Sequence, residues 1–284
     1  MLTHEHSIRI DQYGQLAGAL PVQTLACRSG NLRQAGDWVA DEVPVALQYN
    51  GISHAVMLAT PQDLEDFAYG FSLSEGLIDD EAELHDVEVE PAEHGMVVHI
   101  EIASRCEVRL KERRRTLAGR TGCGLGGIES LSQALPRCER RVAPMMLETD
   151  ALSRALAEMR GGQALQSATG ATHAAAWCSP DGAVQLLRED VGRHNALDKL
   201  IGALARTRTD ATTGFFAVTS RASYEMVQKT VRAGVGVLAA ISAPTALAIR
   251  SAQAAELCLI GFARGSDWVA YSATERVNLA PLAS

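Results

Sequence analysis

The chain has 284 residues, of which 47% are hydrophobic and 21% charged, the composition of a soluble globular protein with one or two domains. Its net charge of −8 argues against a general nucleic-acid binder, because such proteins are usually basic. The most apolar stretch, 235–249, is too short to cross a bilayer, and the polar start lacks a secretory signal. The six cysteines are scattered without a close pair, so we expect a cytoplasmic protein with reduced thiols and no membrane contact.

Residues 1–145 are predicted to form a small, β-rich α+β domain. We expect 1–35 to be extended and partly disordered, followed by strands at 37–40, 43–49 and 52–59. Asn50-Gly51 predicts a type I′ hairpin turn between the last two. Thr60 is expected to cap a helix that has Pro61 at its first position and runs to about Ile78. Two further strands are predicted near 84–90 and 96–103.

Residues 146–284 are predicted to form a second, α/β domain in which strands alternate with helices. Helices are expected at about 150–160, 196–205, 224–232 and 245–255. Strands are expected at 173–178, 183–188, 215–219, 235–241, 257–262 and 268–271. This alternation predicts a mixed, mostly parallel sheet with helices on both faces, and ligands bind such sheets at the carboxyl ends of the strands.

Cys123 lies in the glycine-rich stretch 120–127, just after a basic run at 111–115. Glycines leave little bulk around its sulfur, and nearby cations stabilise a thiolate. These features predict an accessible nucleophile. The alternative is an inert cysteine in an ordinary loop.

Charged and polar residues gather where the predicted strands of the second domain end. The densest group is 188–195, which contains Arg193 and His194. Arg221 lies in a second such loop and Arg264 in a third, whereas 242–245 is interpreted as a helix cap. Arginines and helix starts suit phosphate, so these loops predict an anionic ligand such as a nucleotide. Asp190 and His194 are candidates for acid and base, or for residues that cap the helix and hold Arg193 in place.

His173 precedes a strand of small residues and invites comparison with zinc deaminases. Their site needs H-x-E and a later P-C-x-x-C. The residue two after His173 is Ala175, and P-C-x-x-C is absent from the sequence. No zinc is therefore expected, and His173 is interpreted as a structural hydrogen-bonding group or as part of the nucleotide pocket.

The string from Glu189 to Lys199, E-D-V-G-R-H-N-A-L-D-K, closely resembles the signature of the formate dehydrogenase accessory sulfurtransferases, the FdhD/NarQ family. Segments 74–78, 172–176, 219–229 and 261–265 match as well and occur in the expected order. The resemblance covers nearly the whole chain from about residue 40.

This resemblance implies a sulfur carrier in molybdenum cofactor maturation. Such proteins take persulfide sulfur from a cysteine desulfurase and pass it to the molybdenum bis(molybdopterin guanine dinucleotide) cofactor, bis-MGD below, for insertion into the formate dehydrogenase catalytic subunit. The resemblance also implies a homodimer, a cytidine-deaminase-like second half without zinc, and a guanine nucleotide as a partial mimic of the bound cofactor. The sulfur-carrying loop, C-G-x-C-G, places its first cysteine at Cys123. The implied cofactor-binding segment falls on Phe262, Ala263, Arg264, Gly265, Ser266 and Asp267.

The sequence departs from the family pattern at Gly126, where the second loop cysteine is expected. Three interpretations stay open. Cys123 works alone, another cysteine reaches it in space, or sulfur transfer is lost and only cofactor binding and delivery remain.

Overall fold

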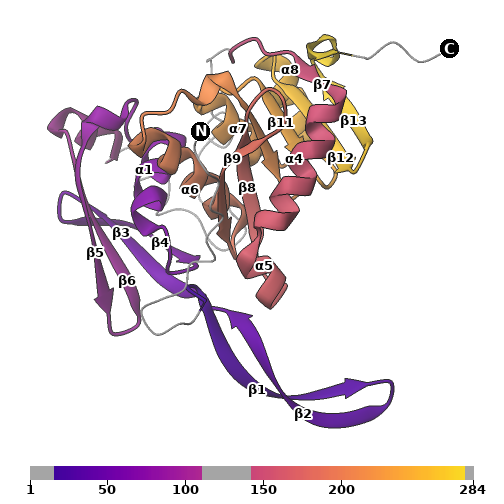
Figure 1. Ribbon diagram of the computed structural model, residues 1–284. Coiled ribbons are helices and arrows are strands. Elements are labelled where there is room, and N and C mark those ends of the chain that lie inside the picture. The colour runs from indigo at the N-terminus through magenta and orange to yellow at the C-terminus, as the bar shows by residue number, and fades with distance from the viewer. Residues whose placement is uncertain (1–15, 111–141, 279–284) are drawn as a thin grey trace.

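A computed structural model describes residues 16–110 and 142–278. Figure 1 shows three parts in chain order, which are a long hairpin, a four-stranded sheet with one helix, and a larger sheet with helices on both faces. The structure is thus the mixed α/β fold that the sequence predicts. In the part that the structure describes, no helix is both long and apolar enough to span a membrane.

The hairpin corrects the expectation of an extended, partly disordered start within residues 19–35. Strands β1 (Ala19–Arg28) and β2 (Asn31–Ala40) pair antiparallel over their whole length. They are joined at Ser29 and Gly30, whose φ angles of 52° and 81° are those of a type I′ turn. The hairpin was missed because its residues are mostly exposed, so no apolar alternation marks it.

The four-stranded sheet has the order β4-β3-β6-β5. Its strands are β3 (Val43–Tyr49), β4 (Ile52–Ala59), β5 (Leu84–Ala92) and β6 (Gly95–Ile102). The predicted Asn50-Gly51 turn is confirmed, with φ angles of 48° and 76°. Helix α1 (Leu64–Ser74) covers the inner face, where Phe67 and Phe71 join the buried strand residues.

Helix α1 is shorter than predicted at both ends. Asp63, with a left-handed φ of 55°, stands before its first residue, so Thr60 is not the cap. The helix stops at Ser74, and Gly76 has a φ of 69°, which ends the helical path before Ile78. Thr60 instead bonds to residues more than a hundred positions away, as described below.

The six-stranded sheet has the order β13-β12-β11-β10-β8-β9. Its strands are β8 (His173–Cys178), β9 (Val184–Asp190), β10 (Phe215–Val218), β11 (Val237–Ala240), β12 (Cys258–Arg264) and β13 (Asp267–Ser272). Only β10–β11 and β11–β12 are parallel, so the prediction of a mostly parallel sheet was wrong. Short turns join β8 to β9 and β12 to β13, and such connections force antiparallel pairing.

Helices cover both faces of this sheet, as predicted. Helices α6 (Arg193–Arg206), α7 (Tyr224–Arg232) and α8 (Ala246–Ala254) pack on one face, and α4 (Thr149–Gly162) packs on the other. Phe215 faces α4, whereas Phe216 faces the opposite core, because successive strand residues alternate. The other described elements are α5 (Ala164–Thr169), the paired strands β7 (Leu147–Glu148) and β14 (Val277–Asn278), and 3₁₀ turns at Glu81–Glu83, Ser104–Cys106, Ala211–Thr213 and Thr274–Arg276.

Helices α1 and α6 cross closely and join the two predicted domains. At the crossing, a Cβ on Gly70 would lie 1.7 Å from Asp198 O, and one on Gly202 would lie 1.8 Å from Asp66 O. Only glycine therefore permits this approach. The domain boundary at 145/146 stays a prediction.

Candidate functional site

The polar loops predicted from the sequence meet along one edge of the six-stranded sheet, which we call the loop edge. His173 at the start of β8 pairs with Asp190 at the end of β9. Further along the loop edge, Thr219 N–H donates to Ala174 O at 3.0 Å, and Ser242 N–H donates to Ser220 O at 3.4 Å. The backbone itself thus places the loops after β9, β10 and β11 side by side.

Arg193 is the first residue of α6 at this edge. Its Nε is buried and has no hydrogen-bond partner among the described residues. No described carboxylate forms a salt bridge with Arg193, Arg221 or Arg264, in contrast to Arg188 and Arg206. The loop edge therefore carries guanidinium groups that form no salt bridge within the described part of the chain, a suitable arrangement for an anionic ligand.

The two histidines of the loop edge are neutral at pH 7. Burial lowers the pKa of His194 to about 4, with help from the nearby charges of Lys229 and Arg193. Burial and Arg193 also lower the pKa of His173, whose Nδ1 lies 3.4 Å from Thr219 Oγ1. Each ring can therefore offer a ligand one donor and one acceptor, rather than a positive charge.

Asp190 is fully occupied by structural bonds and is not a free acid or base. Its Oδ2 accepts from Lys199 Nζ at 2.6 Å and from Thr60 N and Oγ1 at 3.1 and 2.9 Å. Its Oδ1 accepts from Gly192 N and Asn195 Nδ2 at 2.7 and 3.0 Å. The sequence left two roles open for Asp190, acid or base on the one hand and a structural residue at the helix start on the other, and the structure supports the structural role.

A second buried ion pair involves Asp198, which directly precedes Lys199 on α6. Lys229 Nζ donates to both oxygens of Asp198, at 2.8 and 2.9 Å, and to Ser74 Oγ at 2.8 Å. Burial opposes the charge of Lys229, but Asp198 and Glu75 outweigh it and raise the pKa of the amine. Like the bonds of Asp190 and Lys199 to Thr60, this cluster ties the first half of the chain to the second. Sequence reasoning missed this structural use of the signature, because no local pattern reports partners this distant.

Glu189, the first residue of the signature, is also structural. Its carboxylate accepts from Leu165 N at 2.9 Å and Gln166 N at 2.8 Å at the start of α5, and from Thr172 Oγ1 at 3.0 Å. Within the signature, Arg193 and His194 are left as the candidates for ligand contact.

The segment 262–267 begins at the loop edge and then turns towards α4. Phe262 N–H donates to Ser242 O at 3.3 Å, and the 45% exposed Phe262 has a left-handed φ of 53°. Ala263 is buried against the α4 side of the sheet, so its side chain is not available to a ligand. Ser153 Oγ of α4 donates to Gly265 O at 2.8 Å. The exposed members of the segment are Phe262, Arg264, Gly265, Ser266 and Asp267.

The loop edge is wide enough for a ligand larger than a mononucleotide. Four strand spacings of about 4.8 Å separate β9 from β12, or roughly 19 Å. The structure brings His173 and Arg193 close together at one end, and places Phe262 and Arg264 on the strand near the other.

Cys123, with the basic run before it, lies outside the described residues. The flanking residues Leu110 and Val142 are both buried in hydrophobic cores. Arg109 forms a 2.8 Å salt bridge with Asp79, and Ala143 N–H donates to Gly234 O at 3.0 Å. The described residues on either side of this segment are thus held in the fold.

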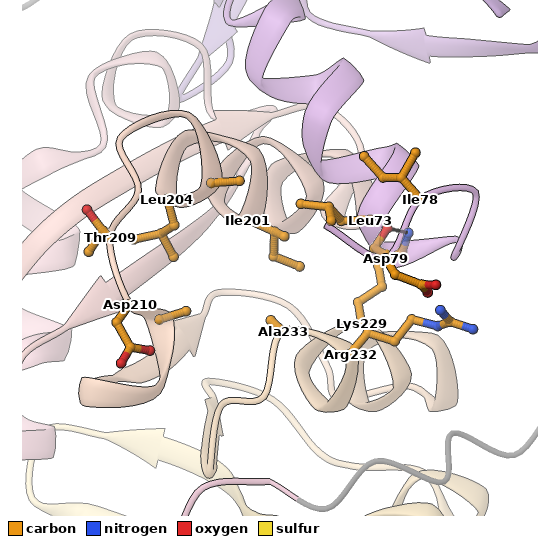
Figure 2. A pocket seen from close by; sticks show the side chains of 13 residues that line it. Leu73, Ile78, Asp79, Ile201, Leu204, Thr209, Asp210, Lys229, Arg232 and Ala233 are labelled. Atoms are coloured by element: carbon orange, nitrogen blue, oxygen red, sulfur yellow. Dashed lines mark hydrogen bonds between the residues drawn. The ribbon is translucent and has the colours of Figure 1, made fainter. Parts of the chain in front are cut away.

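A pocket of about 650 Å³ lies beside these anchors, between the ends of α1, α6 and α7. Figure 2 shows Leu73, Ile201 and Leu204 between the Asp79 end and the Asp210 end of its wall. Helix α6 starts at the loop edge, and its residues from Ile201 onward line this pocket. The two regions are therefore about 12 Å apart along the helix, measured from Arg193 to Ile201.

Comparisons with known proteins show the family to which the chain belongs. The chain is 56% identical over 245 residues to the sulfur carrier protein FdhD of Bordetella petrii, covering 86% of this chain and 88% of that protein. It is 57% identical over 255 residues to the sulfur carrier protein FdhD of Cupriavidus necator, covering 88% and 87%. The fold matches the crystal structure of a formate dehydrogenase accessory protein from Desulfotalea psychrophila, with a TM-score of 0.73 and 22% identity over 92% of this chain and 99% of that one. The profile of the FdhD/NarQ family matches residues 40–278, and the chain therefore belongs to that family.

Proposed function

We propose that this protein is a sulfurtransferase that carries sulfur as a Cys123 persulfide from a cysteine desulfurase to bis-MGD for formate dehydrogenase. The loop edge holds the guanine nucleotide ends of the cofactor. Family membership supports sulfur carriage, and the observation that carries the nucleotide site is the buried, unpartnered Nε of Arg193 beside His173. The protein acts in the cytoplasm as a homodimer, in contact with the desulfurase and the formate dehydrogenase catalytic subunit.

The loading step requires only one cysteine. The Cys123 thiolate attacks the terminal sulfur of the donor's persulfide, the donor's S–S bond breaks, and the donor leaves as a thiolate. One S–S bond is exchanged for another, so no external oxidant is required. Gly126 is then compatible with loading.

All described cysteines except Cys27 are poorly suited to attack the donor's persulfide. Burial raises the pKa of Cys258 to about 11 and raises that of Cys178 further. Burial also raises the pKa of Cys106, next to Glu83. Cys27 is exposed on the hairpin, which makes it the matched control for Cys123.

Guanosine diphosphate binding tests the nucleotide site. Because Arg193 would lose a charge-assisted contact to phosphate, Arg193→Ala should weaken binding by roughly tenfold or more in titration calorimetry. Arg154→Ala is the control, since Arg154 lies on α4 and pairs with Glu158 and Asp181. Equal affinity of Arg193→Ala and the wild type would contradict the proposed site.

Gly126 favours one alternative, a chaperone that binds and delivers the cofactor without sulfur chemistry. In that case Arg264→Ala impairs formate dehydrogenase maturation, whereas Cys123→Ala matures it normally. Under the sulfur-carrier proposal, Cys123→Ala abolishes maturation while guanosine diphosphate binding survives.

A further inference from the structure

The hairpin of β1 and β2 extends away from the rest of the molecule, as Figure 1 shows. Apart from the half-buried Ala35, every residue from Asn31 to Val39 is exposed, including Leu32 at 68% and Trp38 at 36%. Leu25 on β1 is 67% exposed on the same face. A two-stranded ribbon with apolar side chains in water is marginally stable, so a partner that extends this sheet would stabilise it.

The two outer edges of the hairpin differ in their capacity to pair. β1 contains Pro21, opposite Trp38, and proline at a free edge blocks further pairing. β2 contains no proline. Its Trp38 N–H donates to the Asp37 carboxylate at 2.9 Å, which shows that this group faces away from β1. By alternation, the backbone groups of residues 32, 34, 36 and 38 face the free edge.

The sequence of β2 is chemically complementary to itself when reversed about Ala35. Residues equally distant from Ala35 form pairs, namely Gln34 with Gly36, Arg33 with Asp37, and Leu32 with Trp38. The middle pair joins opposite charges and the outer pair joins two apolar side chains. A twofold symmetric interface requires self-complementarity of this kind, because every pair of contacting residues occurs twice across it.

We propose that two copies of the chain associate through the free edge of β2, antiparallel, with Ala35 on the twofold axis. The result is a continuous four-stranded sheet of two hairpins. Arg33 faces the partner's Asp37 on one side of the sheet, and Leu32 faces the partner's Trp38 on the other. The same register places residues 32, 34, 36 and 38 opposite one another, so the outward backbone groups pair.

Charge at the two ends of the hairpin supports this register. Arg28 and Arg33 lie towards the tip, whereas Asp37, Asp41 and Glu42 lie towards the base. In the antiparallel arrangement the basic tip of each copy reaches the acidic base of the other. A parallel arrangement would place like charges together.

The β2 contact surface rests on the homodimer of the proposed function, but it does not depend on sulfur transfer. Cross-linking tests the register in a Cys27→Ser background, which removes the exposed native thiol. The proposed register brings the two Ala35 Cα atoms to about 4.5 Å, within the range of a disulfide. Leu32→Cys is the control, since its two copies would lie six residues apart, or roughly 20 Å.

We expect Ala35→Cys to form a covalent dimer under mild oxidation on a non-reducing gel, and Leu32→Cys to stay at the level of the background. Charge exchange gives an independent readout by sedimentation. Arg33→Asp or Asp37→Arg alone should weaken the dimer by about tenfold or more, because each replaces two attractions by repulsions. The double exchange should restore it.

The outcomes separate the two claims. A wild-type chain that is monomeric at tens of micromolar would refute the homodimer and this surface together. A dimer in which Ala35→Cys does not cross-link, or which both single exchanges leave intact, would refute the β2 surface alone.

Discussion

Replacing Lys199 by methionine tests how the two parts of the chain are held together. Lys199 Nζ is fully buried, 2.6 Å from Asp190 Oδ2, and also donates to Thr60 O at 3.0 Å and Thr60 Oγ1 at 2.8 Å. Methionine keeps the apolar stem but removes the charge, which leaves the Asp190 carboxylate buried without its counter-ion. Breaking one side of a buried ion pair costs about 3–5 kcal/mol. Since domains are stable by about 5–15 kcal/mol, this is a large share of the total.

Urea unfolding, followed by circular dichroism and tryptophan fluorescence, measures this loss. Arg160→Met is the matched control, because Arg160 is exposed on α4 and should change stability by no more than about 0.5 kcal/mol. A loss below about 1 kcal/mol for Lys199→Met would refute the role given to this ion pair.

Two further stability predictions use the same assay. Gly70→Ala should cost at least about 2–3 kcal/mol, because its Cβ would lie 1.7 Å from Asp198 O, whereas Gly161→Ala meets nothing within 4 Å and should be neutral or slightly stabilising. His194 has a pKa of about 4 in the folded state and about 6.5 when unfolded, so the unfolded state takes up its proton first as the pH falls. The contribution of His194 to the free energy of unfolding, roughly 3 kcal/mol, is thus fully present above pH 6.5 and is lost as the pH falls towards 4. His194→Gln should reduce this loss of stability at low pH. A variant with the same pH dependence of stability as the wild type would contradict the lowered pKa of His194.

Local patterns predicted most of the elements that position the site. Helix α7 was predicted at 224–232, where the structure places it, because its apolar residues recur with helical spacing. The Asn50-Gly51 turn followed from glycine and asparagine tolerating positive φ. Predictions failed where distant partners decide the structure. Thr60 has the chemistry of a helix cap, but its hydroxyl is held by Asp190 and Lys199, so α1 begins later.

The sequence predicted where the polar loops lie, but not which of their residues are used in structural bonds and which are left for a ligand. Strand ends in the sequence predicted that Arg193 and the loop after β10 lie at one edge, and the structure places both there. His173, for which a structural role and a place in the pocket were both open, lies at the same edge because it starts β8 opposite Asp190. The signature string indicated a functional loop, yet Asp190 and Lys199 are committed to a buried ion pair. Only three-dimensional packing distinguishes these residues from Arg193, whose Nε is left without a described partner.

Intact-protein mass spectrometry after incubation with a cysteine desulfurase and cysteine shows directly whether Cys123 carries sulfur. Wild type, Cys123→Ala and Cys27→Ser are compared before and after reduction. If Cys123 carries the sulfur, we expect a reducible mass increase of one sulfur, about 32 Da, on wild type and Cys27→Ser but not on Cys123→Ala. An adduct that persists on Cys123→Ala, or no adduct on wild type with an active desulfurase, would contradict it.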